Sequence, residues 1–217
     1  DRPRHAALPR SFHGGTQVTI VADAGWLSAS GRAVRTRSTR GRSPESAIRR
    51  TIQVAGGAGE GPTKLAAFDA ALCDAGVANF NLIYLSSVIP PNSDIQVSVD
   101  GSVRAEGEWG DRLYVVMAEQ RTDVIGEEAW AGVGWVQQEH DGRGLFVEHH
   151  GRGELEVRAD IEASLGALCD ARAGEFGPVG MAVSGVTCEG LPACALVVAV
   201  FGAEPWGDPK QSEFMVS

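Results

Sequence analysis

The chain has 217 residues, a formal net charge of −9 and 43% hydrophobic residues. This length allows one substantial hydrophobic core, with room for an appendage. The acidic balance argues against a nucleic-acid-binding surface on most of the chain. The early apolar run at residues 16–21 is too short to span a membrane, so we expect no membrane partner.

Charge is distributed unevenly along the chain. Residues 1–50 hold ten arginines and three acidic residues, whereas the other 167 residues hold 9 basic and 25 acidic ones. A basic segment with little to bury predicts a disordered extension over 1–50, within which residues 16–21 could form a short strand. Such a tail could touch nucleic acid or an anionic surface, but a dispensable extension is the simpler interpretation.

The four cysteines show neither metal-binding spacing nor the density of a disulfide scaffold. Their neighbours are small and apolar, which predicts buried thiols in a reducing cytoplasm. The acidic and histidine runs at 139–141 and 148–150 contain metal-ligand residue types. Adjacent strand residues point to opposite faces, however, so we expect no metal site there.

The first helix is predicted over residues 63–75. Thr63 is a typical N-cap and Gly76 a typical left-handed terminator, with Leu65, Phe68 and Leu72 on the buried face. Ahead of this helix lies a glycine-rich approach that we interpret as a loop, because it lacks the spacing of a phosphate-binding motif; its glycines are Gly56, Gly57, Gly59 and Gly61.

Alternating or continuous apolar runs predict the remaining elements. A second helix is expected over 154–172, with Leu155, Ile161, Leu165 and Leu168 near one face. Strands are expected at 79–86, 95–99, 112–118, 129–136, 144–149, 179–183 and 193–201. The glycines within 129–136 indicate close packing, and the fully apolar run 193–201 indicates a strand covered on both sides. This mixture predicts an α+β fold, followed by a polar tail at 203–217.

The run of apolar residues at 79–85 ends in Ser86-Ser87, and Pro90-Pro91 follows shortly after. Such a rigid strand end can hold the Ser87 hydroxyl against the Ser86 carbonyl. An N→O acyl shift followed by β-elimination would then cleave the chain. The dehydroalanine left at position 87 would lose ammonia to water and become a pyruvoyl group, a covalent cofactor that accepts electrons. The simpler interpretation of a Ser-Ser dipeptide is an ordinary turn.

The stretches 61–72, 75–82, 85–91 and 144–148 together resemble the pyruvoyl-dependent arginine decarboxylases of archaea and some bacteria. The resemblance covers about two-thirds of the chain and implies a decarboxylase domain over 51–202. It implies a layered sandwich with mixed or antiparallel sheets inside and helices outside, assembled as a homotrimer of processed protomers. The implied reaction converts L-arginine to agmatine and carbon dioxide.

The resemblance also implies site residues. Cleavage would occur between Ser86 and Ser87, and Asn81 would assist processing or orient the substrate, although an asparagine at a strand start more commonly bonds local backbone. Glu148 follows an apolar run that favours a protonated carboxyl group, suited to reprotonating the substrate carbon; an outward-facing edge glutamate is the alternative. Asp69 would bind the guanidinium group across a subunit interface, its alternative being a solvated helix carboxylate.

Two other functions remain open at this point. One is a related pyruvoyl enzyme acting on histidine or another amino acid, which the match of Asp69 to a guanidinium group disfavours. The other is an unprocessed homologue in which Ser87 stays serine and the chain acts as a binding or structural module. The tryptophans at 109, 130 and 135 are interpreted as packing and interface residues.

Overall fold

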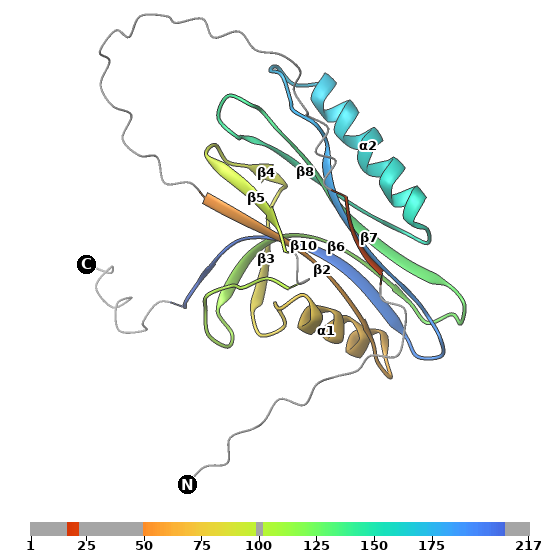
Figure 1. The fold of residues 1–217 in the computed structure, drawn as a ribbon. Helices are drawn as coiled ribbons and strands as arrows, with labels where there is room; N and C mark the ends of the chain where they lie inside the picture. Colours follow the sequence, from red (N-terminus) through yellow and green to blue (C-terminus); the bar gives the residue numbers. More distant parts are fainter. Residues whose placement is uncertain (1–16, 22–49, 99–101, 207–217) are drawn as a thin grey trace, which may run out of the picture.

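The computed structural model describes residues 17–21, 50–98 and 102–206, which form ten strands and two helices (Figure 1). An antiparallel sheet has the order β1-β9-β7-β8-β4. Its strands are β1 (Gln17–Val21), β9 (Gly180–Thr187), β7 (Glu128–Gln137), β8 (Gly144–Gly151) and β4 (Val88–Ile89). Most of the basic N-terminal segment, residues 1–16 and 22–49, lies outside the described residues, while β1 agrees with the short strand expected at 16–21.

The second sheet is mixed and has the order β3-β6-β10-β2-β5. Its strands are β3 (Asn81–Tyr84), β6 (Arg112–Thr122), β10 (Ala193–Glu204), β2 (Arg50–Glu60) and β5 (Ser93–Val97). The two outer strands run parallel to their neighbours, and the inner pairs are antiparallel. The fold is therefore α+β with one mixed and one antiparallel sheet, as the sequence predicts.

Strand β10 lies at the centre of the mixed sheet and is buried from Ala193 to Val200. Alternate residues serve two cores. Leu196 and Val198 belong to a cluster shared with the first helix, whereas Val197 and Ala199 belong to a cluster shared with β7, β8 and β9 of the other sheet. The predicted strand covered on both sides is confirmed. The strand continues to Glu204, beyond the point where we expected the polar tail to begin.

The first helix, α1 (Lys64–Asp74), begins at Thr63, whose hydroxyl accepts a hydrogen bond from Ala66 N, and ends before Gly76 at φ +80°. Its buried residues are Ala67, Ala71 and Leu72. Leu65 is 69% exposed, so the predicted buried face was wrong at that position. Small alanines face the sheet because the helix backbone lies almost against it.

Of the glycines in the approach to α1, Gly56, Gly57 and Gly59 lie not in a loop but in the second half of strand β2, and Gly61 follows its end. A Cβ atom on Gly57 would lie 2.3 Å from the backbone oxygen of Ala71, and one on Gly59 would lie 2.5 Å from its nitrogen. These glycines therefore allow the helix and the strand to make backbone contact. The loop interpretation was wrong because glycine marks close approach here rather than a turn.

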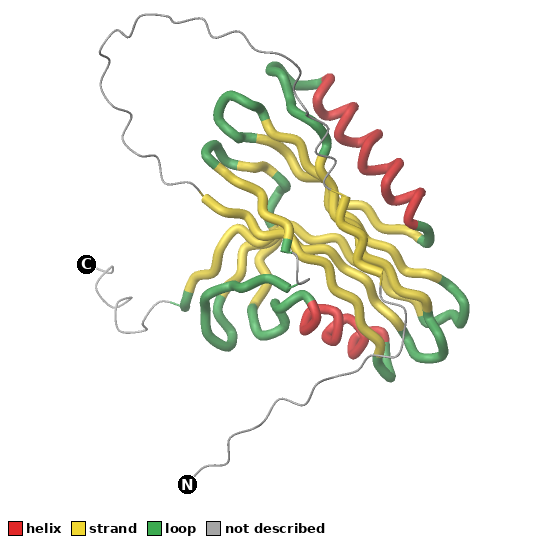
Figure 2. Tube along the Cα trace, viewed as in Figure 1, coloured by secondary structure: helices red, strands yellow, loops and turns green. Residues whose placement is uncertain are grey.

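The second helix, α2 (Glu154–Asp170), covers the antiparallel sheet, with Val157, Ile161 and Leu165 fully buried. A Cβ atom on Gly134 of β7 would lie 2.1 Å from Cγ2 of Ile161, which confirms the close packing expected from the glycines of this strand. Leu155 is 82% exposed, so its predicted burial was wrong. Figure 2 shows the strands lying between the two helices.

The four cysteines differ in burial. Cys188 and Cys194 are buried, as expected, but Cys73 is exposed on α1 and Cys169 is half-buried on α2, so the prediction of four buried thiols was wrong. Within the described ranges, neither helix is long and apolar enough to span a membrane. The expected tail at 207–217 lies outside the described residues.

Candidate active site

Ser87 stands at an unusual point of the backbone between β3 and β4. Its φ of +62° lies in the left-handed region, which a residue with a side chain adopts at a cost of roughly 1–3 kcal/mol. Its carbonyl oxygen accepts a hydrogen bond from Phe146 N at 2.8 Å, which holds the residue against strand β8. Ser86 is exposed on the preceding side. The predicted cleavage point is therefore followed by a residue with a strained backbone, which the neighbouring strand fixes in place.

The Ser87 hydroxyl donates a hydrogen bond to Oε1 of Glu148 on β8. Strand β4 pairs with only Gly144 and Leu145 of β8, so the edge of β8 beyond them is open toward Ser87. Alternation along the strand places Glu148 on the same face as Phe146, away from Val147, which packs beneath α2. The two residues predicted to carry the chemistry thus meet in a single chain.

A cavity of about 490 Å³ opens around this pair between the edge of β8 and the C-terminal half of α2. Its wall is largely apolar, and its polar groups besides the pair come from His149 and Ser164, whose Nε2 and Oγ are 2.8 Å apart. The lining residues are Ser87, Phe146, Val147, Glu148, His149, Ser164, Ala167 and Leu168. The sequence did not point to Ser164, because the pattern of α2 indicates which residues are buried and not what its polar residues face.

Asn81 is not in contact with Ser87. It begins β3, where it pairs with Arg112, and its side-chain amide donates to the carbonyl oxygen of Gly110. A strand rises about 3.3 Å per residue, so the six residues from Asn81 to Ser87 separate the two along the chain. Within one chain, the Asn81 side chain bonds the backbone just before the neighbouring strand β6, 29 positions along the chain, and the role expected for it stays a prediction.

Asp69 is exposed on α1 and is likewise distant from Ser87 in the fold. Helix α1 packs on β2, β10 and β6 of the mixed sheet, whereas the Ser87–Glu148 pair lies beside α2 on the antiparallel sheet. Figure 1 shows the two helices on opposite sides of the strands. A single chain therefore does not bring Asp69 to the cavity.

The arrangement of Ser87 and Glu148 suits a hydroxyl nucleophile and its base. A carboxylate that accepts the hydroxyl hydrogen bond is positioned to remove that proton as the oxygen attacks. The left-handed backbone turns the chain sharply beside the Ser86 carbonyl, the group that an acyl shift would use.

Comparison with known proteins identifies the family. The family model described as pyruvoyl-dependent arginine decarboxylase matches residues 51–204. The chain belongs to this family. A protein of Halobacterium salinarum named pyruvoyl-dependent arginine decarboxylase is 38% identical over 154 residues, 70% of this chain and 93% of the relative. A protein of the same name from Picrophilus torridus is 34% identical over 104 residues, 48% of this chain and 56% of the relative.

The residues of this chain fit the pyruvoyl group that the family uses. Position 87 carries a hydroxyl residue, its side chain meets a carboxylate, and its backbone is strained. The cavity at this point leaves room for a substrate next to the group. The resemblance seen in the sequence and its cofactor are thus supported by the geometry of Ser87 and by family membership.

Proposed function

We propose that this chain cleaves itself between Ser86 and Ser87 and then decarboxylates L-arginine to agmatine and carbon dioxide. The observation that carries the proposal is the hydrogen bond from the strained Ser87 to Glu148. Membership of the pyruvoyl-dependent arginine decarboxylase family supports the substrate and the covalent group.

Processing begins when Ser87 Oγ attacks the carbonyl carbon of Ser86. Glu148 takes the hydroxyl proton and passes it to the departing nitrogen as the C–N bond breaks, so an ester and a free amine replace the amide. Removal of the Ser87 α-proton then expels the Ser86 carboxylate, leaving Ser86 as a new C-terminus and dehydroalanine at 87. Water adds to this residue and ammonia leaves, which gives the pyruvoyl group. Release of the left-handed strain at Ser87 favours these steps.

The pyruvoyl group supplies an electron sink for the electron pair that remains when carbon dioxide departs. Glu148 keeps its place beside position 87 and delivers a proton to the substrate α-carbon. Phe146 and Val147 line the cavity next to this carboxylate. The same carboxylate would thus serve both as base in processing and as acid in turnover.

We further propose a layered sandwich that assembles as a homotrimer. Packing of α1 and α2 on different sheets, with a shared core between the sheets, supports the layered arrangement. Assembly is supported by the separation of Asp69 from Ser87, because a carboxylate that binds the arginine side chain must then come from a neighbouring chain. Apolar side chains near these residues are exposed and available for such an interface: Leu65, Ile83, Tyr84 and Val88.

The domain bounds and the location are proposed from composition and from the burial of two thiols. We assign the decarboxylase domain to 51–202 and leave the basic extension 1–50 and the tail 203–217 outside it. Two fully buried thiols, Cys188 and Cys194, are typical of a reducing compartment, which supports a cytoplasmic location. Arginine is the proposed small-molecule partner, with neither nucleic acid nor membrane required for the reaction.

Intact mass spectrometry of the purified protein tests the proposal, combined with measurement of agmatine from arginine. We expect two fragments, the first ending at Ser86 and the second beginning with a pyruvoyl group, and agmatine formation in proportion to the cleaved fraction. A single uncleaved chain without activity would instead indicate a binding or structural module. A cleaved protein that prefers histidine would support the proposed self-cleavage and contradict the proposal that arginine is the substrate.

A further inference from the structure

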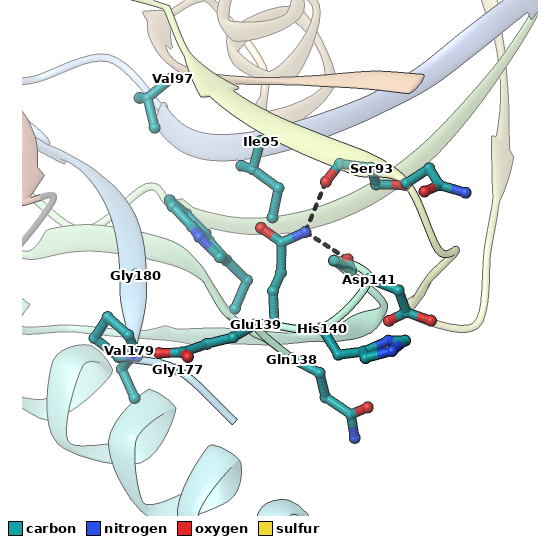
Figure 3. A pocket seen from close by; sticks show the side chains of 15 residues that line it. Ser93, Ile95, Val97, Gln138, Glu139, His140, Asp141, Gly177, Val179 and Gly180 are labelled. Carbon is teal, nitrogen blue, oxygen red and sulfur yellow. Dashed lines mark hydrogen bonds between the residues drawn. The ribbon is translucent and has the colours of Figure 1, made fainter. Parts of the chain in front are cut away.

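A second cavity, larger than the one at Ser87, lies elsewhere among the described residues. It measures about 720 Å³ and lies between strand β5, the turn joining β7 to β8, and the start of β9. Figure 3 shows Ser93 and Ile95 on the β5 side and Glu139, His140 and Asp141 on the turn opposite. The two cavities share no lining residue. The proposed reaction leaves this second cavity without a role.

Ser93 gives the cavity an unusual polar group. The residue is only 8% exposed, and its hydroxyl has no hydrogen-bond partner among the described residues. Strand alternation puts its side chain on the same face as Ile95 and Val97, which also line the cavity. An unpartnered buried hydroxyl costs free energy and is rare in native proteins, so its presence at a cavity wall points to a ligand.

Gln137 holds the opposite walls of the cavity together. Its Nε2 donates to the backbone oxygen of Ser93 at 3.0 Å and to that of Gly142 at 2.6 Å. Both amide hydrogens are thereby used, which leaves the carbonyl oxygen Oε1 to accept a further bond. The turn is thus tied to β5, and the cavity is framed before any ligand arrives.

The polar groups of the cavity favour a cation. Glu139 and Asp141 contribute carboxylates at the rim, and Arg143 holds the pKa of Asp141 below its ordinary value by hydrogen bonding. Asp141 is thus ionised but already paired, whereas Glu139 forms no ion pair within the described part of the chain. Among the described residues, no lysine or arginine lines the cavity, while the indole of Trp135 adds a surface that attracts cations.

The remaining walls are apolar. Ile95, Val97 and Val179 offer surface to a hydrocarbon chain, while the acceptors Gln137 Oε1 and Ser93 Oγ can bind a positively charged donor. A ligand that satisfies both parts has a primary ammonium group on a short alkyl chain. Neither an anion nor a purely apolar molecule would use the acceptors and the free carboxylate.

We propose that this cavity is a second small-molecule site, separate from the Ser87 pair, which binds an aliphatic primary ammonium ion. Ser93 and Gln137 bond the ammonium group, Glu139 adds charge at the rim, and β5 and β9 hold the alkyl chain. The proposal does not depend on self-processing or decarboxylation.

Isothermal titration calorimetry of the full chain with 1,4-diaminobutane tests the proposal, using 1,4-butanediol as a probe of equal length without charge. We expect the diamine to bind at one site per chain that Asp69→Ala does not affect, and the diol to bind at least about tenfold more weakly, the loss expected when a hydrogen bond to a charged group is replaced. Equal affinity for the two probes, or loss of the diamine site in Asp69→Ala, would overturn it.

Ser93→Ala separates a ligand-binding role from a structural one. Because its hydroxyl has no partner in the part of the chain that the structure describes, the variant should keep or raise its melting temperature while binding the diamine about five- to tenfold more weakly. Ser184→Ala is the matched control, since that buried hydroxyl donates to Gly57 O at 3.1 Å and its removal should lower the melting temperature. A destabilised Ser93→Ala protein with unchanged diamine affinity would contradict the assignment.

The contribution of charge is tested with a pair of glutamates. Glu139→Gln at the rim should weaken diamine binding about two- to fivefold, the usual value of an exposed ion pair. Glu189→Gln removes the same charge in the exposed turn between β9 and β10, at the other end of β9 from the cavity, and should leave affinity unchanged. An equal effect of both variants would mean that only the net charge of the protein attracts the diamine, and it would overturn the proposed site.

Discussion

The hydroxyl of Ser87 donates a hydrogen bond to Oε1 of Glu148, a residue 61 positions further along the chain. The contact exists before any cleavage, because position 87 is a serine in this structure. Glu148 is therefore placed to act on the chain itself as well as on a substrate. This links the two stages of the proposed reaction through one carboxylate.

Glu148→Gln should slow both stages. The amide keeps the shape of the side chain but can neither take the Ser87 proton nor deliver one to the substrate carbon. General acid–base catalysis contributes ~10²–10⁴-fold, so the rate of cleavage and the turnover of any processed fraction should both fall by about that much. Gel densitometry over time and agmatine release per cleaved chain measure the two rates. Glu162→Gln, on an exposed face of α2, is the control. Unaltered turnover in the cleaved Glu148→Gln fraction would leave this carboxylate with no part in decarboxylation.

Ser87→Ala and Ser87→Gly should both remain single, inactive chains, because neither carries a nucleophile. They should differ in stability. Glycine adopts the observed φ of +62° without a Cβ clash, so Ser87→Gly should be more stable than Ser87→Ala by about 1 kcal/mol. Urea denaturation of the two uncleaved proteins measures the difference. Equal midpoints would show that the backbone at 87 is not strained, and cleavage of either variant would exclude the Ser87 hydroxyl as nucleophile.

Elements whose signals are local in the chain could be predicted from the sequence. The unbroken apolar run at 193–201 predicted a strand covered on both sides, and Thr63 and Gly76 predicted the ends of α1, since these signals are local. The glycines of β2 misled us because their reason, the backbone of α1 at contact distance, is not local. Leu65 fits the helical period as well as the buried residues do, and the period alone does not choose between faces.

The candidate site likewise combines a feature that the local sequence indicates with a partner that only the fold brings near. The strand end at Ser86-Ser87 suggested the chemistry, but its partner could be assigned only through the resemblance, because pairing across 61 positions is set by the sheet. The second cavity could not be predicted at all. Its key group, the hydroxyl of Ser93, looks in sequence like an ordinary serine at the start of a strand, and only the fold shows it to be buried without a partner among the described residues.

Gly57→Ala should destabilise the fold, because its added Cβ would lie 2.3 Å from the backbone oxygen of Ala71. Overpacking of this kind costs typically about 1–3 kcal/mol. Gly166→Ala provides the opposite case, since this glycine lies inside α2 with nothing within 4 Å of an added Cβ, and alanine there should stabilise by roughly 0.5–1 kcal/mol. Chemical denaturation of both variants gives the signs. A stabilising Gly57→Ala would mean that α1 and β2 are further apart than observed.

Thiol chemistry should distinguish the core from the surface. Burial raises the pKa of Cys194 to about 12, whereas Cys73 is exposed. At pH 8, iodoacetamide should therefore alkylate Cys73 quickly and Cys194 only after unfolding. The raised pKa also sets a direction for stability. Keeping this thiol neutral contributes fully to the free energy of unfolding below the ordinary thiol pKa of about 8.5. That contribution is lost as pH rises toward 12, because over this range only the unfolded chain ionises the thiol. Peptide mapping by mass spectrometry checks the order, and early alkylation of Cys194 would contradict its burial.

Asp69 should determine substrate choice without affecting cleavage. If a neighbouring chain brings its carboxylate to the guanidinium group, Asp69→Ala removes one partner of a buried charge pair, which typically costs ~2–5 kcal/mol. The value of kcat/KM for arginine should then fall by roughly 30- to several-thousand-fold, and that for uncharged citrulline should fall much less. Cleavage at Ser86-Ser87 should proceed, because Ser87 and Glu148 meet within one chain. Asp69 lies on α1, which packs on the mixed sheet and not beside this pair. The decisive measurement is the ratio of kcat/KM for the two substrates in both proteins. An equal fall for arginine and citrulline would assign Asp69 to the fold or the assembly and not to recognition of the guanidinium group.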